Sequence, residues 1–318
     1  MQITKVIPVK DANIVSSNVP ENDYPVHLMT TNYLLGDYVI TTGVDEHRVW
    51  LAVHGVTATY PLGNIGYNPL AELNLNAPVH WALQGATNKY KMFDSYVSST
   101  TVQAESLEIV LTNMGNINTV SLQKCSGKEA RLIITKPDLT VVTDITKSLI
   151  STAGRSNWWN YFTAPVLNKN TALFNDITPS YNATISITIN NPGADCALGL
   201  LVIGNGIQFN LSERSENSVN RGAGVRNRDF SVKQLLSTGD YTFKQGETAL
   251  DGNFEFAFPN SLFDLYVQTV INIGSAPCLI TATNIYDATN IYGLIVDSDP
   301  RLDYASHTTA RLKVEGLI

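Results

Sequence analysis

Apolar and polar residues alternate along most of this chain, a pattern typical of β-strands with one buried face. The clearest example is residues 183–189, where Ile185, Ile187 and Ile189 alternate with threonine and serine. We expect these three isoleucines to face a core. Similar alternation, or a more continuous apolar run, occurs at residues 107–111, 131–135, 198–203, 253–258 and 310–315. The chain is therefore expected to be mainly all-β.

One segment near the C-terminus has helical periodicity instead. Its apolar positions recur three or four residues apart, at Leu262, Leu265, Tyr266, Val270 and Ile273. Ser261 is suited to cap the start of this helix, and Gly274 is suited to end it. Strands packed on a single helix indicate a C-terminal α+β module.

Composition divides the chain into four parts. We predict an N-terminal arm (1–23), a small aromatic β-module (24–91), a β-sandwich or jelly roll (92–215) and a C-terminal α+β docking module (216–318). The polar residues 212–228 are interpreted as a linker or long loop. Removal of the first 91 residues is expected to leave the remainder folded.

Charge and composition exclude several classes of partner. Charged residues make up only 15% of the 318 residues, against the roughly 25% usual for soluble proteins. This favours a subunit of an assembly over a free cytosolic enzyme.

The net charge is -7 and no run of lysine or arginine is present, so nucleic acid is not an expected partner. No stretch has the roughly 18 apolar residues of a membrane span, and the first residues lack the apolar core of a signal peptide. We therefore expect a soluble protein made in a cytoplasm.

Motifs for metal, cofactor or nucleotide binding are not apparent. Cys125, Cys196 and Cys278 are widely separated, which indicates neither a zinc site nor a disulfide framework. The five histidines are scattered, so no metal or cofactor is expected. Asn205-Gly206 is interpreted as a hairpin turn and not as part of a phosphate-binding loop.

Glycan cleavage needs two neighbouring carboxyl groups, and the sequence offers two candidate pairs of aspartates. These are Asp138 with Asp144, and Asp297 with Asp299. Both pairs lie in contexts that resemble turns, where aspartate is favoured because its side chain bonds local backbone amides. We therefore expect no catalytic residues and no enzymatic activity.

Aromatic residues are concentrated in the small β-module. Flat rings stack on sugar faces, and the candidates for glycan binding are Trp50, Trp81, Tyr60 and Tyr67. The alternative is that the tryptophans form the core of the module, which has few other ways to bury area.

A second aromatic cluster lies at residues 158–162. Trp158, Trp159 and Tyr161 are expected on a strand, with Trp158 and one neighbour pointing outward. Exposed aromatic residues are typical of an interface.

Several motifs resemble those of known families. The segment NYLLGDYV (residues 32–39), followed by Trp50 and Trp81, resembles the small chitin-binding-like modules found in chitinases and on phage tail proteins. His27 and Trp50 stand where these modules usually carry tryptophan and tyrosine.

The next segment, GATNKYKMFD (residues 85–94), resembles the junction in a family of tailed-bacteriophage structural proteins. The resemblance continues through residues 130–138, 159–162, 179–184 and 312–318.

The resemblance implies a non-enzymatic virion structural protein at the tail tip, baseplate or fibre base, assembled in the bacterial cytoplasm. Its partners would be other tail or baseplate proteins and further copies of itself, threefold or sixfold symmetry being natural for a tail. The small module would face outward and contact host surface polysaccharide. The alternatives are a tail-associated glycan hydrolase and a structural spacer between tail proteins.

Overall fold

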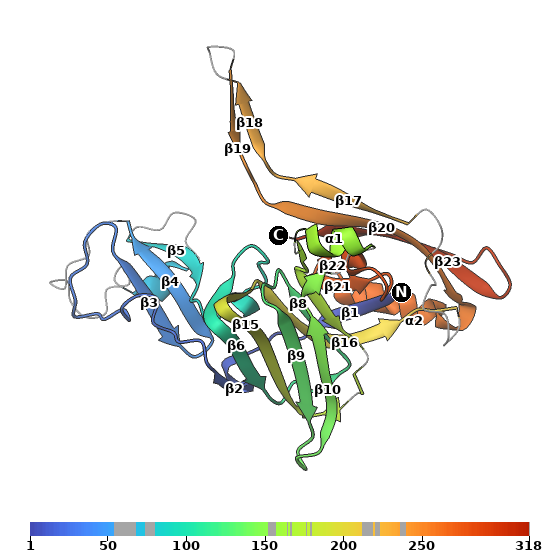
Figure 1. Ribbon diagram of the computed structural model, residues 1–318, viewed down its shortest axis with the longest axis horizontal. Coiled ribbons are helices and arrows are strands. Elements are labelled where there is room, and N and C mark those ends of the chain that lie inside the picture. Colours follow the sequence, from blue (N-terminus) through green and yellow to red (C-terminus); the bar gives the residue numbers. More distant parts are fainter. Residues whose placement is uncertain are drawn as a thin grey trace.

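The structure is a computed structural model that describes residues 1–53, 68–73, 80–151, 157–163, 165, 167–175, 177–178, 180–211, 219, 223–235 and 240–317. Within these ranges the fold is mainly β, with several sheets and a clear C-terminal helix, as expected (Figure 1). A large sheet and a second sheet form the body, and a small module and a long hairpin project from it.

The large sheet is antiparallel between all the neighbouring strands described. Its order is β13 (Thr171–Phe174), β8 (Thr119–Gln123), β16 (Leu200–Gln208), β1 (Gln2–Val6), β21 (Cys278–Thr281), β22 (Asn290–Arg301), β23 (His307–Gly316), β20 (Thr248–Pro259) and β17 (Gly224–Asp229).

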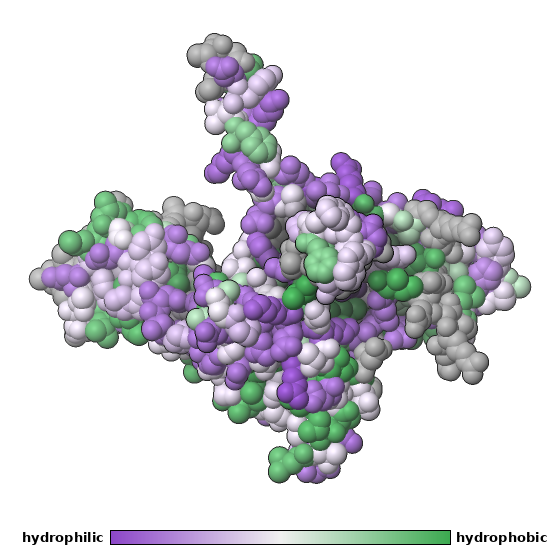
Figure 2. All heavy atoms as spheres, viewed as in Figure 1, coloured by the Kyte–Doolittle hydropathy of each residue, from purple (hydrophilic) through white to green (hydrophobic). Residues whose placement is uncertain are grey.

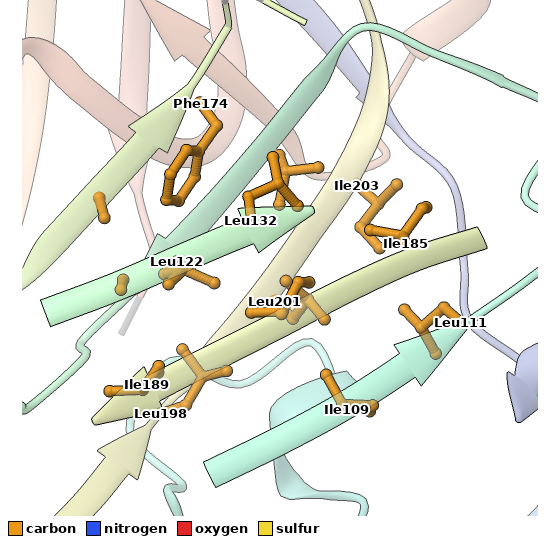
Figure 3. Close-up of a cluster of buried hydrophobic side chains, with 14 of the residues drawn as sticks. Ile109, Leu111, Leu122, Leu132, Phe174, Ile185, Ile189, Leu198, Leu201 and Ile203 are labelled. Carbon is orange, nitrogen blue, oxygen red and sulfur yellow. The ribbon is translucent and has the colours of Figure 1, made fainter. Parts of the chain in front are cut away.

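The second sheet packs against one end of the large sheet, as in a β-sandwich. Its order is β10 (Val141–Ser148), β9 (Glu129–Thr135), β15 (Thr184–Leu198), β6 (Thr101–Leu111) and β2 (Ile14–Ser17). Side chains from both sheets meet in one core, which Figure 3 shows in close-up. Ile185, Ile187 and Ile189 are buried in it, so the predicted strand register is confirmed.

The predicted C-terminal helix is α2 (Phe263–Ile273), and it covers the same face of the large sheet farther along. Tyr266 of α2 packs against Phe256 and Phe258 of β20, which face this core as alternation predicts. Gly274 ends the helix with a φ of 57°, a left-handed conformation that glycine adopts without strain.

Two details of the helix differ from expectation. Ser261 lies in a preceding 3-10 turn (Asn260–Leu262), and the residue at the N-cap is Leu262, which makes no side-chain cap. Leu265 is exposed instead of buried.

The N-terminal segment is a strand inside the large sheet and not an arm. β1 pairs with β16 on one side and with β21 on the other, so it joins the predicted sandwich to the predicted C-terminal module. The structure argues against the expectation that the chain folds without its first 91 residues, because their removal would leave β16 and β21 without their shared neighbour. The predicted boundary at residue 215 likewise does not divide the sheet.

Asn205-Gly206 is also not a turn. Both residues lie within β16 and pair with Lys5 and Thr4 of β1. A Cβ atom on Gly206 would overlap the side chain of Gln2, so this glycine leaves room for that side chain to lie across β16. The strand continues because β1, which is distant in sequence, supplies a pairing partner.

The small module contains β3 (Tyr38–Gly43), β4 (Glu46–Ala52) and β5 (Trp81–Ala86). The long hairpin contains β18 (Val232–Leu235) and β19 (Tyr241–Lys244), and it continues outward from β17 and β20. Residues 224–228, expected in a loop, belong to β17, whereas residues 212–218 and 220–222 of that predicted loop lie outside the described residues.

Two short strand pairs and one short helix lie apart from these sheets. β11 (Ile150–Ser151) pairs with β12 (Leu167–Asn168), and β7 (Asn116–Ile117) pairs with β14 (Ser180–Tyr181). The helix α1 (Trp158–Thr163) lies on the surface, and none of its residues is buried.

Candidate functional site

The tryptophans expected to bind glycan form the core of the small module. Trp50 and Trp81 are both 0% exposed, and they pack with Tyr33, Val39 and Ala52. The indole nitrogen of Trp50 donates to Thr41 Oγ1 over 3.1 Å. Neither ring presents a face to solvent, so the sugar-stacking role is wrong for both, and the alternative of a tryptophan core is correct. Tyr60 and Tyr67 lie outside the described residues.

The second aromatic cluster is exposed, but on a helix instead of a strand. Trp158, Trp159 and Tyr161 of α1 are 79%, 73% and 59% exposed. The rings of Trp158 and Phe162 meet edge to face with centroids 4.8 Å apart. Asn157 supplies the sequence signal for the helix: its side-chain oxygen accepts from the amide of Asn160, as an N-cap does.

The carboxyl groups considered for catalysis do not form a pair of acid and base. Asp138 accepts from the amide of Thr140 over 2.9 Å, which confirms the turn role predicted for it. Asp144, however, lies in β10, and Asp297 and Asp299 lie in β22, so the prediction of turns is wrong for these three. The strand register shifts close to these residues, between Val141 and Thr143 in β10 and between Ile295 and Asp297 in β22.

The electrostatics of these carboxyls also do not suit a general acid. The bond from the Thr140 amide lowers the pKa of Asp138. Arg131 lowers the pKa of Asp144, and Arg301 lowers that of Asp299. A general acid at neutral pH needs a raised pKa, which these three carboxyls lack.

A polar cluster that the sequence patterns did not indicate joins the small module to the body. His47 of β4 lies with Nε2 at 2.8 Å from Asp11 and Nδ1 at 2.7 Å from Glu21. His47 therefore bridges two carboxyl groups, one at each ring nitrogen. Asp11 and Asp45 also accept from each other's backbone amides, over 2.8 and 3.1 Å.

This cluster shifts the pKa values of its members. Burial alone would raise the pKa of Asp11, but hydrogen bonds from His47, the Asp45 amide and Tyr90 outweigh it and hold that pKa below its ordinary value. Burial, followed by the bond to Asp11, raises the pKa of Tyr90 well above its ordinary value. The phenol therefore stays protonated and remains a donor at neutral pH.

The motif at residues 85–94 has a structural role at the same junction. Thr87 donates to Glu21 over 2.9 Å, and Asn88 exchanges two hydrogen bonds with the backbone of Val102 on β6. An open groove lies beside the cluster. Residues of the N-terminal segment, of the small module and of the segment that follows the module line it, including Asp45, Arg48, Leu83, Asp94 and Tyr96. The sequence carries no local signal for this junction, because Asp11, Glu21 and His47 come from distant positions.

The thiols and the acidic groups show no metal centre in the part of the chain that the structure describes. No group of three or more histidine, cysteine, aspartate or glutamate side chains there could hold a metal ion. Cys125, Cys196 and Cys278 are buried free thiols, and burial raises the pKa of Cys125 and of Cys278 to about 12. Among the described residues no helix has the length and apolarity to cross a membrane.

Comparison of the chain with protein-family models, with curated proteins and with solved structures finds no match.

Proposed function

We propose that this chain is a non-enzymatic structural subunit of a tailed-phage virion, placed at the tail tip, baseplate or fibre base. The observation that carries the proposal is α1, which presents Trp158, Trp159 and Tyr161 to solvent on one short helix. Large aromatic side chains exposed together are characteristic of protein interfaces, where burial of their area drives association. The resemblance of residues 85–94 to a phage structural family supports the tail as the location.

In this proposal the small module is a spacer or protein contact. Its tryptophans Trp50 and Trp81 serve as core, so neither ring offers a surface on which glycan could stack. The junction of His47, Asp11 and Glu21 suits a module that must hold a defined orientation relative to the body. We further propose that several copies act together around the tail axis.

Reconstruction of the phage particle that contains this chain tests the location. We expect density for the chain in the tail, with α1 buried against a neighbouring protein. A chain that is absent from purified particles would overturn the proposal.

A matched pair of variants tests the contact itself. Trp158→Ala with Trp159→Ala should prevent incorporation into particles while leaving the melting temperature unchanged. Ile271→Ala is the control, because Ile271 of α2 is similarly exposed, at 70%, and lies on another element. Release of reducing sugar from host polysaccharide, abolished by a carboxylate substitution, would instead establish the hydrolase alternative.

A further inference from the structure

The hairpin of β18 and β19 exposes a largely apolar face to solvent. Every residue of both strands is exposed, and Figure 1 shows the hairpin projecting from the body. The pairing places Leu235 opposite Tyr241 and Lys233 opposite Phe243, so these four side chains share one face. Leu235, Tyr241 and Phe243 are each about 60% exposed, at 61%, 59% and 63%. We call this set the hairpin face.

A projecting hairpin of this kind is marginal in water without a partner. Two isolated strands bury too little apolar area to offset the conformational entropy of ordering them. The hairpin face also includes Lys233, whose ammonium lies 3.7 Å from the centre of the Tyr241 ring. The face is therefore apolar with a basic edge.

The charge of the hairpin differs in sign from that of the chain as a whole. Residues 232–244, from the start of β18 to the end of β19, contain two lysines and one aspartate, a net charge of +1, whereas the whole chain has -7. The basic residues are Lys233 and Lys244. A basic projection on an acidic protein is electrostatically complementary to another copy of the same protein.

Complementary features are combined in one segment of the small module. Residues 23–38 contain two acidic residues, Asp23 and Asp37, and neither lysine nor arginine. The same segment exposes large apolar side chains at Tyr24, Val26, Leu28, Met29, Leu34, Leu35 and Tyr38. We call this segment the module face. Figure 2 shows hydrophobic and hydrophilic residues mixed on the surface of both projections.

We propose that the hairpin face of one copy packs on the module face of a second copy. The hairpin and the module project from the body in different directions (Figure 1), so the contact is between molecules. The two faces are different surfaces, which makes the contact heterologous, and repetition of a heterologous contact closes into a ring when the rotation permits. This inference rests on the proposed role of the chain as a subunit of an assembly, and it specifies the two surfaces through which neighbouring copies bind each other.

The mass of the full chain in solution, measured by light scattering during size-exclusion chromatography, tests the contact. The wild type is expected to associate, and Leu235→Ser with Phe243→Ser should shift it to monomer. Val232→Ser is the matched control, because Val232 is equally exposed on the opposite side of the same hairpin. Circular dichroism should be unchanged in all three proteins. A monomeric wild type, or a control as disruptive as the hairpin variant, would overturn the proposal.

A mixing experiment separates a heterologous contact from a contact between two hairpins. Leu34→Ser with Leu35→Ser should also give a monomer, because it removes exposed apolar residues of the module face. A mixture of the hairpin variant and the module variant retains one intact pair of faces and should form a dimer of the two. If the mixture stays monomeric, the hairpin does not bind the module and the inference is wrong.

Failure here is distinguishable from failure of the proposed function. The hairpin and module variants leave Trp158 and Trp159 intact, so incorporation into particles through α1 is measured separately. A hairpin variant that keeps the wild-type mass, in a chain that still enters the tail, overturns only the contact between copies.

Discussion

The imidazole of His47 stacks on the phenol ring of Tyr90, with ring centroids 3.6 Å apart and planes only 4° from parallel. His47 belongs to β4 of the small module, whereas Tyr90 follows the last strand of the module on the way to the body. The same imidazole bonds to Asp11 and Glu21 of the N-terminal segment. One side chain thus connects three parts of the chain, which explains how the module is held at a defined position.

Replacement of His47 by alanine should destabilise this junction. The change removes the ring contact with Tyr90 and both hydrogen bonds between the imidazole and the carboxyl groups of Asp11 and Glu21. Hydrogen bonds to charged groups contribute about 1.5–3 kcal/mol each, so we expect a loss of roughly 2 kcal/mol in the free energy of unfolding of the module. Urea denaturation followed by tryptophan fluorescence measures it, since Trp50 and Trp81 lie in the module core.

His307→Ala is the control for that change. His307 also stacks on a tyrosine, Tyr304, with centroids 4.4 Å apart, but in a more exposed setting. We expect a much smaller effect there, and equal effects of the two substitutions would contradict the role assigned to the carboxylates.

The junction should also weaken in acid through Asp11. The pKa of Asp11 is lower in the folded protein than in the unfolded chain, where an aspartate has a pKa of about 3.9. The ionised carboxylate therefore stabilises the fold at any pH above the unfolded pKa. This stabilisation is lost as the pH falls through the folded pKa. Asp11→Asn should therefore reduce the loss of stability below about pH 4. The measurement is the urea midpoint as a function of pH, and Glu108→Gln, a charge-matched change at an exposed site, should leave the curve unchanged.

The tryptophan core of the module predicts a large effect on stability. Trp81→Ala removes a fully buried side chain, and such a substitution costs about 3–5 kcal/mol. We expect the module to unfold at a lower temperature while the body keeps its transition, as calorimetry would show. A folded variant with normal stability but reduced binding on a glycan array would restore the ligand role that burial argues against.

Strand β1 should be essential to the body. Ile3 is 1% exposed and lies in the core beneath α2. Ile3→Ala should lower the free energy of unfolding by about 3 kcal/mol, and removal of residues 1–6 should leave the chain aggregated. Lys5→Ala, at an exposed position of the same strand, is the control and should change the free energy of unfolding by less than about 0.5 kcal/mol.

Local patterns in the sequence were sufficient wherever neighbouring residues decide the structure. Alternation placed Ile185, Ile187 and Ile189 in the core, because successive side chains of a strand point to opposite faces. Gly274 was correctly expected to end the α2 helix, because glycine tolerates the left-handed conformation found there. The mainly β class follows from the same short-range rules.

The tertiary structure decided what depends on partners distant in the chain. Asn205-Gly206 has the composition of a turn, yet pairing with β1 keeps it extended. Trp50 and Trp81 suit a sugar site or a core equally well by composition, and only the closure of the small module around them made them core. The cluster of His47, Asp11 and Glu21 arises only when three segments meet, since a hydrogen bond depends on distances in space that spacing along the chain does not determine.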